Sequence, residues 1–181
     1  MDKPSTIIVN LFGEPGSGKS TGAAYIFSML KMMGINAELV TEFAKSLVWD
    51  ENDIAFKCQP YIWGNQVYMI DRCIGKVDVI INDSPTLLSV VYADDQRIGD
   101  EFKQAVLNWF NGYKNKNYLI LRDNGFQQSG RRHSKKQSVE IGLKIGRMLE
   151  EYDIPFHPIP GTQSGYHDIV DDILSELENQ K

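Results

Sequence analysis

The sequence has few cysteines and no long apolar run. Its 181 residues include two cysteines, Cys58 and Cys73, at isolated positions. This usage predicts reduced thiols in the core of a cytoplasmic protein and excludes a disulfide-stabilised scaffold. No apolar run approaches the roughly 20 residues that cross a bilayer, and the run near the N-terminus is too short for a signal peptide. We therefore expect no membrane association.

Metal-ligand patterns and an excess of positive charge are also missing. The three histidines, His133, His157 and His167, lack the spacing of a metal site. The net charge of −5 at pH 7 argues against indiscriminate binding of nucleic acid, although a local basic patch still allows it. With 42% hydrophobic and 24% charged residues, the composition is that of a globular protein. The length predicts a single domain over residues 1–181 and makes no prediction of the oligomeric state.

A glycine-rich segment stands out against this background. The stretch "LFGEPGSGKS", residues 11–20, fits the pattern G-x-x-x-x-G-K-[ST] with Gly13, Gly18, Lys19 and Ser20 at the required positions. In such a phosphate-binding loop, backbone N–H groups and the start of a helix surround an anion. The alternative is a glycine-rich turn that binds nothing. It is disfavoured because a buried strand is predicted before the loop and a helix after it.

The loop predicts which residues hold the phosphates and a metal ion. Lys19 is expected to reach the terminal phosphates and so to take part in catalysis, and the Ser20 hydroxyl is expected to hold a magnesium ion that bridges them. The predicted nucleotide-binding residues are Gly13, Glu14, Pro15, Gly16, Ser17, Gly18, Lys19, Ser20 and Thr21.

Strands and helices alternate along the chain. Apolar runs predict strands over 6–12, 36–41, 77–83, 117–123 and 155–159. Helices are predicted over 20–34, over 44–75 as two helices broken near Pro60, from Pro85, and over 101–113, 139–152 and 167–179. This order predicts an α/β fold with three layers and a central five-stranded parallel sheet, which with the phosphate loop is a P-loop NTPase-type fold. Ligands should bind beyond the carboxyl ends of the strands.

Two carboxylates follow predicted strands and are candidate catalytic groups. Glu42 stands where an acceptor would lie, and a hydroxyl acceptor needs a base to take its proton. Asp83 is placed to orient a magnesium ion or to accept that proton. The alternatives are that Glu42 caps a helix or pairs with Lys45, and that Asp83 caps the next helix. No arginine directly follows Asp83, which favours a hydroxyl acceptor over a phosphate.

Basic side chains gather after the fourth predicted strand. Arg122 ends that strand and is a candidate substrate ligand. The polar loop 124–138 carries Arg131 and Arg132, which are expected to act as a lid that neutralises charge on the transferring phosphoryl group. The loop also carries Lys135 and Lys136, so two further interpretations stay open: a solvated loop, or a contact with a nucleic-acid backbone.

Aromatic and amide side chains occupy the segment 58–72, in the region that covers the acceptor in this architecture. Tyr61, Trp63 and Gln66 suit a flat heterocycle, whose face stacks on aromatic rings and whose edge forms hydrogen bonds. They equally suit a helix that packs its aromatic residues inward, and we expect Tyr68 to lie in the core.

Most of the chain resembles a known family. The runs "VNLFGEPGSGKST", "ELVTEFAKSLVW", "QVYMIDR", "VDVIINDSPTLLSVVY" and "FQQSGRRHS" are similar to the small P-loop kinases of tailed bacteriophages, which share their plan with nicotinamide riboside kinase and thymidylate kinase. These kinases include enzymes that phosphorylate 5-hydroxymethyluracil within phage DNA. The resemblance implies ATP as phosphoryl donor, magnesium, a lid with Arg131 and Arg132, and the usual roles for Lys19 and Ser20.

The chain departs from the pattern of many nucleotide kinases in one place. Where they have an Asp-Arg pair, it has Asp83-Ser84-Pro85, which weakens the expectation of a monophosphate acceptor. The leading hypothesis is therefore a kinase that phosphorylates a hydroxyl of a nucleoside-type acceptor, with a hydroxymethyl base in DNA as the first candidate. The alternatives are a kinase of a free nucleoside or ribosyl compound, and a nucleotide-dependent switch without an acceptor.

Overall fold

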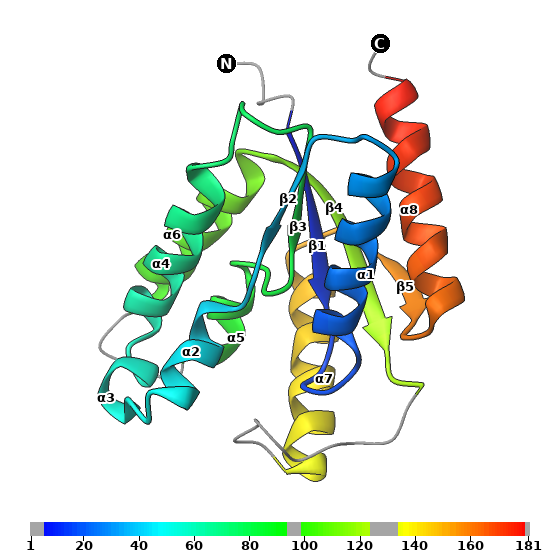
Figure 1. The fold of residues 1–181 in the computed structure, drawn as a ribbon. Coiled ribbons are helices and arrows are strands. Elements are labelled where there is room, and N and C mark those ends of the chain that lie inside the picture. Colours follow the sequence, from blue (N-terminus) through cyan, green and yellow to red (C-terminus); the bar gives the residue numbers. More distant parts are fainter. Residues whose placement is uncertain (1–5, 94–98, 124–133, 180–181) are drawn as a thin grey trace.

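The protein is built on a parallel sheet with helices on both faces (Figure 1). The structure is a computed structural model that describes residues 6–93, 99–123 and 134–179. The strands are β1 (Ile7–Phe12), β2 (Ala37–Val40), β3 (Val79–Asn82), β4 (Lys114–Leu121) and β5 (His157–Pro160). The helices are α1 (Lys19–Met32), α2 (Phe43–Trp49), α3 (Asp53–Phe56), α4 (Gln59–Asp71), α5 (Leu88–Tyr92), α6 (Gly99–Asn111), α7 (Lys135–Glu151) and α8 (Gln163–Glu178).

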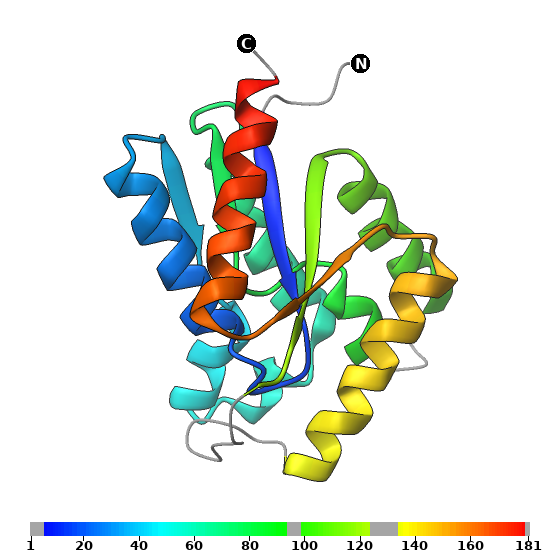
Figure 2. The same ribbon diagram turned by 90° about the vertical axis from the view of Figure 1, so that its right-hand side faces the viewer.

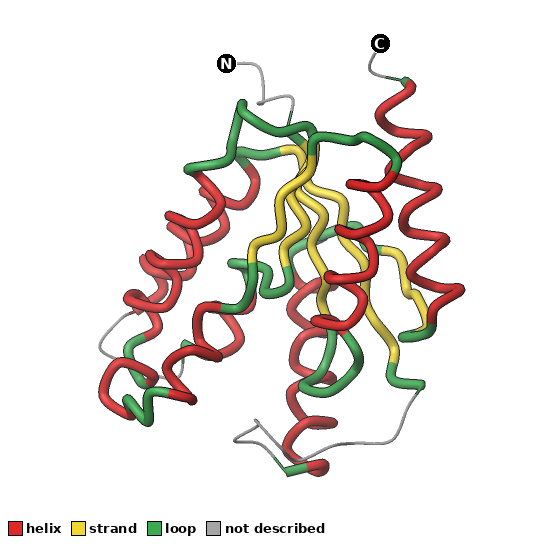
Figure 3. Tube along the Cα trace, viewed as in Figure 1, coloured by secondary structure: helices red, strands yellow, loops and turns green. Residues whose placement is uncertain are grey.

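The five strands lie in the order β2-β3-β1-β4-β5, and every neighbouring pair is parallel. The expected three-layer α/β fold with a central five-stranded parallel sheet is thus confirmed (Figure 3). Because all strands run in one direction, their carboxyl ends meet at one edge of the sheet. The loop between β1 and α1 lies at this edge, in the middle of the sheet.

The central strand β1 is buried on both sides, as helices on both faces require. Its odd-numbered residues Ile7, Val9 and Leu11 pack into one core with α1 and α8. Phe12 packs on the opposite face against α5, α6 and α7, and Ile8 packs there against α4. Figure 2 shows α1 and α8 on one side of the sheet and the remaining long helices on the other.

The helical segment after β2 differs from the expectation of two helices broken near Pro60. Three helices occupy it, and Pro60 lies in the first turn of α4. Proline is tolerated there because its missing N–H would have no partner within the helix in any case. Cys58 precedes α4 and is exposed, so the expectation that both cysteines lie in the core is wrong for Cys58. Tyr68 is 66% exposed, which corrects its expected place in the core.

Two helices begin earlier than expected because capping hydrogen bonds, which the hydrophobic pattern does not reveal, extend them. α7 begins at Lys135 rather than at 139, since Ser134 and Gln137 form a capping box. The last five residues of the expected lid 124–138 therefore belong to this helix and its cap. α8 begins at Gln163 rather than at 167 because the Thr162 hydroxyl accepts a hydrogen bond from an N–H of the first turn.

The start of β4 and the place of Pro85 also differ from the expectation. β4 begins three residues earlier than expected, and Pro85 lies in a turn before α5 rather than in its first turn. Within the described ranges, no helix is long and apolar enough to span a bilayer.

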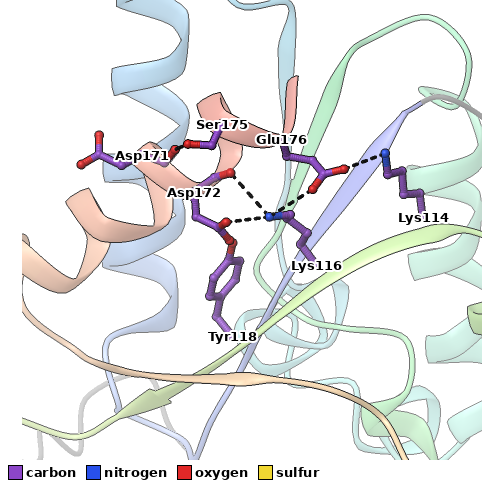
Figure 4. Close-up of polar contacts among 7 residues, drawn as sticks. All are labelled: Lys114, Lys116, Tyr118, Asp171, Asp172, Ser175 and Glu176. Carbon is purple, nitrogen blue, oxygen red and sulfur yellow. Dashed lines mark hydrogen bonds and ion pairs between the residues drawn. The ribbon is translucent and has the colours of Figure 1, made fainter. Parts of the chain in front are cut away.

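Charged side chains join β4 to α8 at the amino end of the strand (Figure 4). Lys116 Nζ lies 2.8 Å from Asp172 Oδ1 and 3.5 Å from Glu176 Oε2. Lys114 Nζ lies 2.8 Å from Glu176 Oε1. The Tyr118 hydroxyl donates a hydrogen bond to the Asp172 carboxylate. This cluster fixes the helix against the strand.

The cluster changes the pKa of both carboxyls. Burial raises the pKa of Asp172, but the hydrogen bonds from Lys116 and Tyr118 and the charge of Lys116 outweigh burial and lower it. The pKa of Glu176 is lowered, mainly by the hydrogen bond from Lys114. A carboxyl whose pKa is lower in the folded than in the unfolded chain stabilises the fold above its unfolded pKa, about 4. That stabilisation is lost as the pH falls through the folded value.

We predict that Asp172→Asn makes the stability less sensitive to acid. The natural chain should lose free energy of unfolding more steeply than the variant as the pH falls below about 4, because the variant has no carboxyl to protonate at this position. Urea unfolding at a series of pH values measures the two slopes. Asp168→Asn, on an exposed position of the same helix, should behave like the natural chain. Parallel curves for the natural chain and Asp172→Asn would contradict the prediction.

Candidate functional site

The loop between β1 and α1 takes a backbone path that requires glycine. Gly13, Gly16 and Gly18 have φ angles of 146°, 83° and 103°, values that L-residues rarely adopt. A Cβ on Gly13 would lie 2.6 Å from Ser17 Oγ and 2.7 Å from the Ile120 carbonyl oxygen. The loop is therefore folded tightly on itself against β4. The N-cap residue of α1, Gly18, has no side chain that could cap the helix, so it leaves room for an anion at the start of α1.

Lys19, Ser20 and Thr21 follow Gly18 and line one cavity at the end of the loop. Lys19 Nζ donates hydrogen bonds to the carbonyl oxygens of Gly13 at 3.0 Å and Glu14 at 3.1 Å. Ser20 and Thr21 are exposed at the start of α1 and line the same cavity as Lys19. These positions suit binding of terminal phosphates and of an ion beside them.

Arg122 was expected to bind substrate, but its guanidinium binds the phosphate loop instead. It is not among the residues that line the cavity described below. Its guanidinium lies 2.8 Å from Glu14 Oε1, and both side chains are largely buried, at 13% and 17% exposed. It also donates to the Pro15 carbonyl oxygen at 3.0 Å and to Ser138 Oγ at 2.6 Å. Ser138 in turn donates to the Pro15 carbonyl oxygen at 2.6 Å. The arginine thus joins the loop to α7.

Tyr166 of α8 closes the other side of the loop, a contact that sequence reasoning missed. Its hydroxyl donates to the Gly18 carbonyl oxygen at 3.0 Å, and a Cβ on Gly22 would lie 2.6 Å from its ring. Gly161, directly after β5, packs against the backbone of Ser17. Gly22 was the sequence feature that could have indicated this contact. A glycine inside a helix costs stability and often marks a place where another residue packs closely.

A cavity of about 240 Å³ extends from the loop between α2, α4 and α5. Glu42 and Gln66 line it, whereas Tyr61 and Trp63 are not among its lining residues. The Tyr61 ring packs edge-on against Phe43, and the Trp63 ring packs edge-on against Phe102. The apolar part of the wall consists of Ala44, Val48, Phe56, Ile62, Pro85 and Leu88, and the polar part beyond the loop of Glu42, Lys45, Gln59, Gln66, Ser84, Thr86, Ser89 and Tyr92.

Glu42 lies at the end of β2, directly before α2. Its side chain makes no capping hydrogen bond, so capping does not account for the residue. Tyr92, at the end of α5, lines the same cavity and was missed by sequence reasoning. Burial, and then the negative charge of Glu42, raise the pKa of the Tyr92 phenol. The phenol thus stays protonated beside the carboxylate. No sequence pattern links these two residues.

Asp83 follows β3, and its carboxylate is 5% exposed. Its backbone N–H donates to the Val40 carbonyl oxygen at 3.0 Å, which fixes the residue at the end of the strand. Among the described residues, its Oδ1 atom has no hydrogen-bond partner. The next helix, α5, has Leu87 at its N-cap position, so Asp83 does not cap it. A buried carboxylate oxygen without a partner is suited to a cation or to a hydroxyl group.

The site fits a magnesium ion held together with phosphates. Magnesium in nucleotide sites is usually bound by one or two protein oxygens and by phosphates, not by a protein cage. The described residues contain no group of three or more metal-ligating His, Cys, Asp or Glu side chains. The Ser20 hydroxyl and the carboxylate of Asp83, whose Oδ1 has no partner among the described residues, are the groups that would hold the ion. Arg131 and Arg132 lie outside the described residues, whereas Lys135 and Lys136 are exposed in the first turn of α7.

We predict that Arg122→Met lowers the free energy of unfolding by about 3 kcal/mol, because Glu14 then keeps a largely buried charge without its cation. The double variant Arg122→Met with Glu14→Gln should recover part of this loss, since it removes both charges. Urea unfolding of Arg122→Met, Glu14→Gln and the double variant provides the measurement. A double variant that loses the sum of the two single losses would contradict the coupling.

The comparison with known families agrees with this geometry. A family model described as an AAA domain matches residues 8–165, from β1 to the start of α8. No curated protein matches the sequence significantly. The matched region contains the phosphate loop, Glu42 and Asp83. The chain therefore belongs to the AAA domain family and is a P-loop NTPase-type domain.

Proposed function

We propose that the protein is an ATP-dependent kinase that transfers the γ-phosphoryl group to a hydroxyl of a nucleoside-type acceptor. The observation that carries this proposal is that one cavity is lined both by the phosphate loop and by Glu42, Gln59 and Tyr92. A nucleotide switch needs room only for the nucleotide and water. A cavity that continues beyond the loop between apolar and polar walls suits an organic acceptor.

The charges of the cavity favour a hydroxyl over a phosphate acceptor. Among the described residues that line it, Lys19 and Lys45 are the cations and Glu42 is the anion, and no arginine lines it. Phosphate recognition typically uses the bidentate arginine fork, and Arg122 is committed to Glu14 and Pro15. A carboxylate beside a neutral phenol instead suits an O–H group that must lose its proton.

The proposed reaction is in-line phosphoryl transfer. The acceptor oxygen forms a bond to the γ-phosphorus, the bond from that phosphorus to the β–γ bridging oxygen breaks, and ADP leaves. Glu42 takes the acceptor proton, and Lys19 neutralises negative charge on the γ-phosphoryl group. A magnesium ion at Ser20 and Asp83 would supply further charge neutralisation on the phosphates. The neutral Tyr92 phenol lines the same cavity beside Glu42.

The first candidate acceptor is the 5-hydroxymethyl group of hydroxymethyluracil in DNA. The exposed Lys135 and Lys136 at the start of α7 support it, because two adjacent exposed cations suit contact with backbone phosphates. Such a base must leave the helical stack to reach the γ-phosphate. A free nucleoside or ribosyl compound would use the same cavity without this basic surface.

We predict that Glu42→Gln lowers kcat about 100-fold or more, because it removes the proton acceptor but keeps the shape of the side chain. Lys19→Ala should abolish transfer, and Glu101→Gln, an exposed control on α6, should leave kcat unchanged. Transfer of label from γ-labelled ATP to free nucleosides and to hydroxymethylated DNA measures these effects and identifies the acceptor. Hydrolysis of ATP without transfer to any acceptor would contradict the kinase and support a switch.

We predict that replacing Lys135 and Lys136 by glutamine flattens the salt dependence of DNA binding. Two lost phosphate contacts should reduce the slope of log K against log salt by about 1–2. Fluorescence anisotropy with hydroxymethylated DNA at several salt concentrations measures the slope. Lys31→Gln, an exposed lysine on α1, should keep the natural slope. An unchanged slope in the double variant would argue for a free nucleoside acceptor.

A further inference from the structure

A row of amide side chains crosses the sheet on the face covered by α4 to α7. Asn10 in β1 is the register partner of Asn82 in β3 and of Asn117 in β4. Register partners in a parallel sheet point to the same face. The three asparagines are 1%, 0% and 4% exposed, and Gln66 of α4, which joins the row, is 4% exposed. The row lies between Ile8 and Phe12 of β1, which belong to two separate apolar cores.

The amides form one continuous chain of hydrogen bonds. Gln66 Nε2 donates to Asn82 Oδ1 at 3.1 Å, and Asn82 Nδ2 donates to Asn10 Oδ1 at 2.9 Å. Asn10 Nδ2 donates to Asn117 Oδ1 at 3.0 Å, and Asn117 Nδ2 donates to the Pro155 carbonyl oxygen at 3.0 Å. Buried amides need such partners, because an unpaired buried polar group costs about 1–3 kcal/mol.

Backbone groups at both ends determine the direction of this chain. The N–H of Phe43 donates to Gln66 Oε1 at 3.0 Å, and a backbone N–H can only donate. The Pro155 carbonyl at the other end can only accept. Every amide in the chain therefore turns its oxygen toward the Phe43 end and its nitrogen toward the Pro155 end. The chain has a single polarity, and hydrogen bonds in such chains strengthen one another.

Gln66 binds the backbone on both sides of Glu42. Its oxygen accepts from the N–H of Phe43, and its nitrogen donates to the Thr41 carbonyl oxygen at 3.2 Å. The same nitrogen donates to Asn82, so both of its hydrogens are used. Although Gln66 lines the cavity, it has no N–H left to donate to an acceptor molecule. Gln66 Oε1 has a second lone pair that can accept a hydrogen bond, so the expectation that Gln66 is a substrate ligand stays a prediction for this oxygen alone.

We propose that Gln66 is the positioning residue of Glu42, and that the amide row fixes its orientation relative to the sheet. The proposal rests on the proposed role of Glu42 as proton acceptor. Because Asn10 lies three residues before Gly13 in β1, the row ties the backbone that carries Glu42 to the strand that leads into the phosphate loop. A misplacement of a catalytic group by about 1 Å can cost 100-fold in rate.

The test is a double-mutant cycle of Gln66→Met and Glu42→Gln, assayed for kcat and for the KM of the acceptor. A positioning role predicts that Gln66→Met lowers kcat about 10–100-fold in the natural background and changes kcat less than about 3-fold in the Glu42→Gln background. The KM of the acceptor should change less than about 3-fold. Asn65→Ala, on the same helix with its side chain bonded to the Tyr61 carbonyl, serves as the matched control that keeps full activity.

A raised acceptor KM with equal losses of kcat in both backgrounds would overturn the proposal, because it would assign Gln66 to direct binding. Gln66→Glu provides a second variant if the methionine variant unfolds, since it keeps the oxygen that accepts from Phe43. It should show the same non-additive loss.

A further readout does not depend on activity. The Phe43 amide should exchange its hydrogen with solvent faster in Gln66→Met than in the natural chain, whereas the Val9 amide should not change. Equal exchange at Phe43 would overturn the positioning role. If the natural chain transfers no phosphoryl group at all, the proposed function fails while the exchange experiment still tests the contact of Gln66.

Discussion

The close approach of backbone to backbone around the phosphate loop is the constraint on which the site depends. Gly13 lies against Ser17 and Ile120, Gly161 lies against Ser17, and no Cβ fits at either glycine. Arg122 forms an ion pair with Glu14 of the loop, and Tyr166 of α8 donates a hydrogen bond to the Gly18 carbonyl oxygen. Its N–H groups are thereby preorganised for an anion before any ligand arrives, so that binding does not have to order the loop.

The turn that carries Glu42 is joined to the phosphate loop through buried amide side chains in the core of the protein. Gln66, Asn82 and Asn10 connect the turn that carries Glu42 to β1, the strand that enters the loop. We propose that these hydrogen bonds hold the Glu42 turn in place relative to the loop, which apolar packing alone would do less strictly. A buried, fully paired amide row costs little stability and restricts the arrangement to one register. The row therefore accounts for polar residues in the middle of strands that are otherwise apolar.

The sequence predicted the fold class and the phosphate loop, because both depend on local patterns. Apolar runs between helices specify a parallel sheet, and the loop has a fixed spacing of glycines. Other features depend on contacts between distant segments. Nothing in the run "IIVNLF" indicates that Asn10 meets Asn82 and Asn117, or that Arg122 turns toward Glu14. In α4 apolar, aromatic and polar residues occur on every face, so the pattern did not show that Gln66 is buried and Tyr68 exposed.

The central claim is that the phosphate loop and Glu42 serve one reaction in one cavity. A crystal structure with a non-hydrolysable ATP analogue and magnesium tests it most directly. The account predicts the triphosphate within the loop between Gly13 and Ser20, the metal ion beside Asp83, and the Glu42 carboxylate facing open space next to the γ-phosphate. A triphosphate bound away from the loop, or a Glu42 carboxylate turned away from the γ-phosphate, would contradict it.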